Sequence, residues 1–347
     1  MSGPGKWGSV SGSVSGFDSR ESLFGGVVAR FAERTANPYA RAAELRLRAP
    51  MAVTVEGRSG VGRDAVARAL AASDLRVVRT GGDVRVVVIA ESMKPEDRQV
   101  PAGGSPAVVV LNKADLSGRV PGGPLAAAAR TAADISVSTG LPVVPMVAHL
   151  ATVELDDELV TALHTLAENP ADMTSGDAFV SSGHPLSTDV RQRLLRRLDR
   201  FGLAHAVLRT AEGADAAALT GSLRELSQLG QLVARLADVA AEVTYRRVRE
   251  VLRDLHRAAA ESDDDELWEF LADDEVVIAV MACAVGVMEA AGLEVDPRDD
   301  ADTHLSRAVH WRRYAEGPLG PLHRRCAADI SRGSLRLLSR AASSGAR

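Results

Sequence analysis

Aromatic residues are scarce in this sequence, and so are cysteines and long apolar stretches. Phe, Trp and Tyr together make up 3% of the 347 residues, so alanine, valine and leucine must fill any core. Cys283 and Cys326 lack the spacing of a metal site or a redox pair, and we expect both to be thiols in a reducing compartment. The apolar run Val276–Met288 is shorter than the about 20 residues that cross a bilayer, so it predicts a helix at the centre of a bundle.

The composition does supply enough apolar and charged residues for about two folded domains. Hydrophobic residues make up 46% of the chain, so a sizeable core can be buried. The net charge of −5 argues against general binding to nucleic acid. The first residues contain one early lysine and no apolar segment typical of a signal peptide, so we expect a cytoplasmic location.

A glycine-rich turn separates an apolar strand from a helix near residue 60. Ala52–Val55 predicts the strand, and an alanine-rich helix follows the turn, which contains Gly57, Gly60, Gly62, Arg63 and Asp64. This frame matches the phosphate loop G-x-x-x-x-G-K-[ST], in which backbone N–H groups and the helix start attract phosphate. Arg63 replaces the lysine that reaches the phosphates, and Asp64 replaces the hydroxyl that binds magnesium. The alternative is a simple turn in which Asp64 favours the helix start.

A second polar signature follows another apolar strand. Ala107–Leu111 is typical of a parallel strand buried on both faces, and Asn112, Lys113, Ala114 and Asp115 come directly after it. Ligands of doubly wound α/β folds bind just beyond such strand ends. The Asp115 carboxylate can accept two hydrogens from the N1 and N2 edge of guanine, which adenine does not offer. The Asn112 amide can face the base or tie loops together, and the Lys113 stem can lie across the base. A polar turn is the alternative.

Together the two motifs resemble those of P-loop GTPases, in which N-K-x-D is the guanine-specificity motif. Leu45–Gly57 is similar to the start of the GTPase domain in bacterial dynamin-like GTPases, and the helical pattern after residue 200 is similar to that of their actinobacterial members. The resemblance covers about Leu45–Leu255 and implies GTP or GDP as the ligand. It also implies that the backbone N–H of Ala148 contacts the base oxygen, while we expect His149 to be a loop residue rather than a catalytic group.

The interval between the two motifs is too short for a complete GTPase. Asp64 and Asn112 are separated by 47 residues, whereas the usual strands, helices and switch segments need roughly 80. Strands are predicted at Leu75–Val78 and Asp83–Ala90, no D-x-x-G follows a strand, and the interval holds a single threonine. Candidates for the residues that bind magnesium and position water are missing, so we expect magnesium binding to be disfavoured.

The rest of the chain predicts a helical bundle beside this shortened α/β domain. We divide the chain into a disordered tail (1–20), an amino-terminal helix that packs on the bundle (21–48), a GTPase-like domain (49–168), a linker (169–187) and the bundle (188–341). Leu229–Ala260 keeps apolar residues at helical spacing and predicts one long helix. Ser262 and the aspartates after it predict a helix start rather than a metal site. His323–Ala341 predicts a basic outer face of the bundle, with contact to anionic lipid as the alternative.

Three functions are compatible with these residues. The leading hypothesis is a pseudo-GTPase that binds guanine nucleotide weakly or not at all, does not hydrolyse it, and acts as a regulatory or scaffolding partner, for example of a complete dynamin-like GTPase. The second is a slow, magnesium-dependent GTP hydrolase in which Asp64, or Asp83 with Glu91, holds the metal. The third is a membrane-associated structural protein whose basic helices contact the membrane surface without crossing it.

Overall fold

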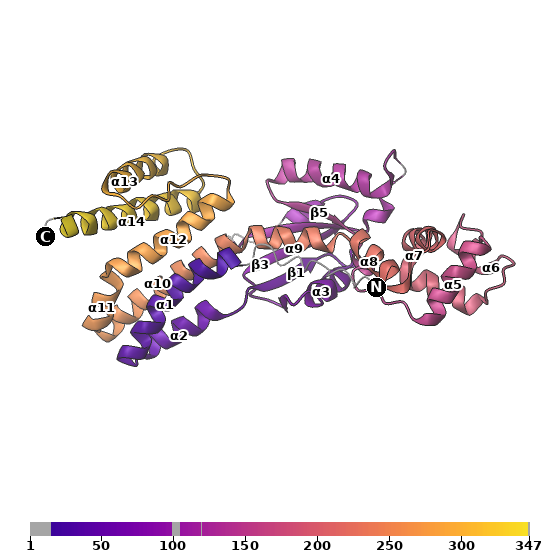
Figure 1. Cartoon of the computed structure of the whole chain (residues 1–347), viewed down its shortest axis with the longest axis horizontal. Helices are drawn as coiled ribbons and strands as arrows, with labels where there is room; N and C mark the ends of the chain where they lie inside the picture. Colours follow the sequence, from indigo (N-terminus) through magenta and orange to yellow (C-terminus); the bar gives the residue numbers. More distant parts are fainter. Residues whose placement is uncertain (1–14, 99–104, 119, 346–347) are drawn as a thin grey trace, which may run out of the picture. The chain divides into compact units, whose positions relative to one another are not determined.

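The computed structural model describes residues 15–98, 105–118 and 120–345 (Figure 1). The chain divides into two compact units. Residues 51–237 form the first, which we call the α/β unit. Residues 1–50 and 238–347 form the second, which we call the helical unit. The helical unit therefore consists of two segments of the chain, one before and one after the α/β unit in the sequence.

The α/β unit is built on a five-stranded parallel sheet with the strand order β2-β1-β3-β4-β5. The strands are β1 (Ala52–Gly57), β2 (Arg76–Val78), β3 (Val84–Ala90), β4 (Ala107–Asn112) and β5 (Val143–Met146). Every residue of β4 is buried, as expected for a central parallel strand. The α/β fold and the parallel sheet predicted from the sequence are thus present.

Helices make up most of the rest of the described α/β unit. They are α3 (Arg63–Ala71), α4 (Gly123–Thr139), α5 (Asp157–Glu168), α6 (Gly176–Ser181), α7 (Thr188–Ala211), α8 (Ala216–Leu226) and α9 (Leu229–Asp238), with short 3-10 turns η1 (Pro95–Arg98), η2 (Ala114–Leu116) and η3 (Ala148–Leu150). Helices α3 and α4 contact the strands of the sheet. Side chains alternate between the faces of a strand, so Val87, Ile89, Val109 and Leu111 share one face of β3 and β4. That face joins buried residues of α4, α5, α7 and α8 in one cluster.

The connection between β2 and β3 is unusually short for a parallel crossover. Parallel strands are normally joined by a dozen or more residues, but only residues 79–83 link these two strands, which lie on either side of β1. The short path works because the end of β2 and the start of β3 lie level with the same part of β1: Val78 pairs with Thr54 and Val84 with Val53. Gly82 lies against β1, where its N–H donates to Thr54 Oγ1 at 2.9 Å. This crossover leaves no helix between β2 and β3.

The boundary between the units differs from the one expected from the sequence. The predicted linker, 169–187, and the start of the predicted bundle, 188–237, both belong to the α/β unit. The reason is Phe179 in α6, whose side chain is fully buried in the core. Buried Arg191 of α7 fixes α6 by donating hydrogen bonds to the carbonyl oxygens of Phe179 and Ser182, at 2.7 and 2.8 Å.

The single long helix predicted at Leu229–Ala260 is wrong, because the structure has two helices that are separated at Val239. The first is α9, and the second is α10 (Ala240–Ser262). The break coincides with the boundary between the two units. Apolar residues keep their helical spacing on both sides of Val239, so periodicity alone does not reveal the break.

The described part of the helical unit contains α10 together with α1 (Ser15–Thr35), α2 (Pro38–Arg48), α11 (Asp265–Ala272), α12 (Asp274–Ala290), α13 (Ala301–Ala315) and α14 (Pro321–Gly345). The apolar run lies in α12, which packs against α1, α10 and α14. Gly333 allows α14 to approach closely, because a Cβ there would lie 2.5 Å from the Cβ of Met281. No helix in the described ranges is long and apolar enough to cross a membrane.

The amino-terminal helices belong to this bundle, since α1 packs on α12 and α2 packs on α10. Residues 15–20, expected in a disordered tail, are part of α1, and the remainder of that expected tail lies outside the described residues. Asp264 caps α11 by accepting a hydrogen bond from the N–H of Leu267 at 2.9 Å, so the aspartates after Ser262 start a helix. Cys283 and Cys326 are buried free thiols.

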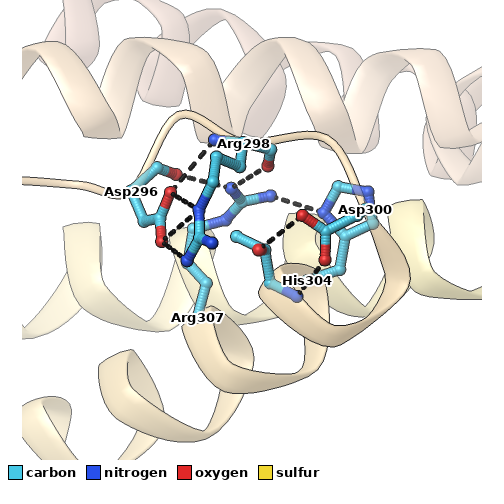
Figure 2. A network of polar contacts seen from close by, with 6 residues as sticks. Asp296, Arg298, Asp300, His304 and Arg307 are labelled. Atoms are coloured by element: carbon cyan, nitrogen blue, oxygen red, sulfur yellow. Dashed lines mark hydrogen bonds and ion pairs between the residues drawn. The ribbon is translucent and has the colours of Figure 1, made fainter.

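Figure 2 shows the polar network that holds the acidic loop before α13. Asp296 and Arg298 form an ion pair at 2.6 Å, and this contact lowers the pKa of Asp296 to about 2. Buried Arg307 donates to the carbonyl oxygen of Asp296 at 2.7 Å and to His304 Nδ1 at 2.8 Å. Asp300 caps the first turn of α13. One buried guanidinium therefore ties the loop to the helix.

Candidate functional site

The residues singled out in the sequence lie at one edge of the sheet. β1 ends at Gly57, β4 ends at Asn112 and β5 ends at Met146, and all the strands run in the same direction. Their following loops therefore leave the sheet on the same side. This edge is where open parallel sheets bind ligands.

Asn112 joins three of these loops. Its side chain is buried, its Nδ2 donates to the carbonyl oxygen of Val61 at 2.8 Å, and its Oδ1 accepts from the N–H of Ala148 at 3.1 Å. Val61 lies in the glycine-rich loop, and Ala148 opens η3 after β5. The sequence offered two roles for the Asn112 amide, and in the structure it ties the loops together. The N–H of Ala148 therefore already has a hydrogen-bond acceptor within the protein.

The glycine-rich loop needs its glycines for different reasons. A Cβ at Gly57 would lie 2.4 Å from the carbonyl oxygen of Val88, and a Cβ at Gly62 would lie 2.3 Å from Asn112 Nδ2. Gly60 has φ +82°, a conformation that L-residues rarely adopt. The loop is thus held in a turn that leads directly into the start of α3. Arg63 and Asp64 stand exposed in the first turn of that helix.

An ion pair that the sequence did not indicate links this loop to the segment after β3. Arg58 Nε lies 2.9 Å from Asp97 Oδ1, and the Asp97 side chain is only 2% exposed. Asp97 also accepts from the N–H of Lys94 at 2.9 Å, and its carboxylate raises the pKa of Arg58. The sequence of residues 94–106 predicts either a helix or a loop. Nothing in it marks Asp97 as the partner of a residue 39 positions earlier.

Asp115 and Lys113 occupy the turn after β4. Asp115 lies in η2 and is partly buried, while Lys113 is exposed and has a left-handed backbone conformation with φ +60°. Burial raises the pKa of the Asp115 carboxyl above its ordinary value. The backbone N–H of Asp115 and the side chain of His149 oppose this rise, and the Asp199 carboxylate adds to it.

A cavity of about 1070 Å³ opens beside Asp115. The expected site residues Gly62, Asn112, Lys113 and Asp115 line one side of it. The other side comes from the segment 173–204, with α7 supplying Leu195, Asp199, Arg200, Phe201 and Ala204. Among the described residues, those that line the cavity do not include Gly57, Gly60, Arg63 or Asp64. The structure therefore brings the N-K-x-D residues and the end of the glycine-rich loop into one cavity, and places the first glycines and the Arg-Asp pair outside its lining.

His149 and Asp199 form the feature of this cavity that sequence reasoning missed. His149 Nε2 lies 3.2 Å from the carbonyl oxygen of Leu198 and 3.3 Å from Asp199 Oδ2. Asp199 interrupts α7 with φ +50° and ψ −178°, a strained conformation for a residue other than glycine. The kink turns the carbonyl of Leu198 toward His149. Within the periodic helix sequence Thr188–Ala211 nothing signals this kink.

The magnesium ligands of the hydrolytic alternative are not placed together. Asp83 lies just before β3 and accepts a hydrogen bond from the N–H of Ala52 at 2.8 Å, so it stands at the amino edge of the sheet. Asp64 and Glu91 follow the glycine-rich loop and β3, at the carboxyl edge. The described ranges contain no group of three or more His, Cys, Asp or Glu side chains arranged to hold a metal ion. Pairing Asp83 with Glu91 was therefore wrong, because the two lie at opposite ends of β3.

Comparison of the chain with protein-family models, with curated proteins and with solved structures gave no match.

Proposed function

We propose that the α/β unit is a guanine-nucleotide-binding module that does not hydrolyse its ligand and that acts by engaging a protein partner. The observation that carries the proposal is the position of Asp115. Its carboxylate lines a cavity wide enough for a nucleotide base, next to the loops that Asn112 ties together. A carboxylate at this position can accept hydrogen bonds from both N1–H and N2–H of guanine.

The surrounding residues support a base-binding role more than a catalytic one. Lys113 and the apolar side chains of Leu195 and Phe201 line the cavity with Asp115, and a concave, mostly apolar surface with few polar groups is typical of ligand sites. Arg63 would neutralise phosphate at the start of α3, although it is a bulkier and more planar cation than lysine. Asp64 would place a negative charge near bound phosphates. This charge would disfavour the binding of GTP relative to that of GDP.

The short interval between Asp64 and Asn112 supports the part of the proposal that excludes hydrolysis. The crossover of residues 79–83 replaces the helix that would connect β2 to β3, so the chain has no long loop there to position water or magnesium. A module without such a loop would act through a partner protein that contacts it and responds to the bound nucleotide. A complete dynamin-like GTPase is the partner class that the sequence resemblance suggests, and sedimentation of the two proteins with and without GDP would test it.

Titration with a fluorescent GDP, with and without magnesium, tests the binding step. We expect saturable binding that requires no magnesium and is lost in Asp115→Ala. The matched control is Asp134→Ala, which removes an exposed carboxylate of α4 outside the cavity lining and should leave binding unchanged.

Asp115→Asn gives a sharper test of the assigned hydrogen bonds. Its amide would donate where the carboxylate accepts, so affinity should shift from GDP toward xanthosine diphosphate, which carries a carbonyl at position 2. Because the carboxylate form is required and its pKa is raised, binding of GDP to the native protein should weaken as the pH falls through that raised pKa. Equal affinity of Asp115→Asn for the two nucleotides would refute the assignment of Asp115 as the reader of guanine.

A further inference from the structure

The helical unit contains a cavity of about 450 Å³ that has no part in the proposed nucleotide site. Arg249, Arg253 and His256 of α10 line it together with Arg325, Asp329 and Arg332 of α14. Figure 1 shows α10 in orange and α14 in yellow. The volume lies within the range of small-molecule sites.

The polar lining carries an excess of positive charge. Four arginines face a single carboxylate, Asp329, when His256 is neutral. Asp329 is buried and already engaged, because it accepts a hydrogen bond from the Tyr245 hydroxyl at 2.6 Å and pairs with Arg249 at 3.4 Å. Its remaining ion pair, with Arg332, is long at 3.8 Å. One occupied carboxylate therefore leaves most of the guanidinium charge uncompensated.

One donor in this cavity is buried without an acceptor, and two of its arginines have no ion-pair partner in the described part of the chain. The Nε of Arg249 is buried without a hydrogen-bond partner. Within the described ranges neither Arg253 nor Arg325 has an ion-pair partner, although both belong to the lining. A guanidinium presents its donors in a planar fork that suits the oxygens of phosphate. Arginines from two different helices would surround such a group from more than one direction.

The remaining lining is apolar. Leu252, Leu271, Val276, Val277 and Val280 come from α10, α11 and α12 and form the wall that carries no charge. A site with convergent cations on one side and aliphatic side chains on the other favours a ligand that has both characters.

We propose that this cavity binds a phosphate monoester that carries a short apolar group. The phosphate lies between Arg253, Arg325 and Arg332, and the apolar group contacts the valines of α12. A phosphate suits the site better than a carboxylate, because a dianion with several acceptor oxygens matches the surplus of guanidinium charge and donors. The same chemistry occurs in a free metabolite and in a lipid head group, and the experiment below separates the two sources.

Calorimetric titration of the full-length protein with inorganic phosphate and with monomeric dihexanoyl phosphatidic acid tests the proposal. We expect saturable binding of both, with the phosphatidic acid tighter because it also fills the apolar side. Arg253→Gln with Arg325→Gln should weaken binding by about tenfold or more, since each substitution removes charged donors. The matched control is Arg257→Gln, which removes a neighbouring exposed arginine of α10 that pairs with Asp254 and does not line the cavity.

A lipid source would add binding to phosphatidylcholine vesicles that contain phosphatidic acid, with the same dependence on Arg253 and Arg325. A free metabolite would leave those vesicles unbound while the soluble probes still bind. No binding of either soluble probe at millimolar concentration would overturn the proposal. Equal losses in the double variant and in Arg257→Gln would overturn it as well, because the effect would then be general surface charge. Equal affinity for phosphate and phosphatidic acid would overturn the apolar half of the assignment.

Discussion

Asn112 is the residue whose replacement most directly tests how the candidate site is held together. Its side chain satisfies the carbonyl oxygen of Val61 and the N–H of Ala148, and Val61 and Ala148 are themselves 4% and 1% exposed. Asn112→Ala would leave both groups buried without a protein partner. An unsatisfied buried polar group costs about 1–3 kcal/mol, so with two such groups we expect the α/β unit to lose about 2–6 kcal/mol of stability. That is a large part of the total stability of an ordinary domain.

The choice of assay depends on where the fluorescent residues lie. Of the three tryptophans, Trp268 and Trp311 belong to the helical unit and Trp7 lies outside the described residues, so no tryptophan in the described part of the α/β unit reports on it. Native-state hydrogen exchange of the amides in β1, β3 and β4 measures the α/β unit directly. Asn169→Ala is the matched control, because Asn169 is exposed and its amide makes one long hydrogen bond of 3.4 Å to Thr165. Its effect should stay within about 0.5 kcal/mol.

Asn112→Asp adds a test of the donor assignment. The new carboxyl keeps the shape of the amide and can still accept from Ala148, but when ionised it offers no donor to the Val61 carbonyl. Its pKa in the folded state should therefore be raised, so the variant should be more destabilised at pH 8 than at pH 5 relative to the native protein. A loss below about 0.5 kcal/mol in Asn112→Ala, or a pH-independent loss in Asn112→Asp, would refute the role of Asn112 as the link between the loops.

Two further predictions concern single buried or strained residues. Burial raises the pKa of the Cys326 thiol to about 12, against about 8.5 in an unfolded chain. The stability that the buried, protonated thiol contributes is therefore fully present below about pH 8.5 and is lost between about pH 8.5 and pH 12. In urea titrations followed by tryptophan fluorescence, Cys326→Ala should lessen the loss of stability between pH 9 and 11 by about 1.4 kcal/mol per pH unit, and an unchanged slope would contradict the buried thiol. Asp199→Gly should stabilise the α/β unit by about 1 kcal/mol, because glycine adopts the conformation of the kink without strain and the exposed contact with His149 contributes little. Hydrogen exchange in α7 measures this change, and faster exchange there would contradict the strain.

Elements with a local signal could be predicted from the sequence alone. Runs of valine predicted β3 and β4, because a strand covered on both faces is apolar at nearly every position. The turn after β4 was also predictable, since Asn112, Lys113 and Asp115 end a buried strand. The uniformly apolar α12 was expected at the centre of the bundle for the same reason. In each case the residues that define the element are neighbours in the chain.

The contacts between segments that are distant in the sequence could not be predicted and became visible in the folded structure. The pairing of Arg58 with Asp97 and the placement of Asp199 beside His149 join residues whose own sequence surroundings say nothing of each other. The anchoring of residues 169–187 by Phe179 likewise depends on a core that other helices build. Local periodicity records which face of an element is buried, but not which element buries it. Hydrogen bonds and ion pairs between remote segments form only once the packing of those faces has fixed the distances between them.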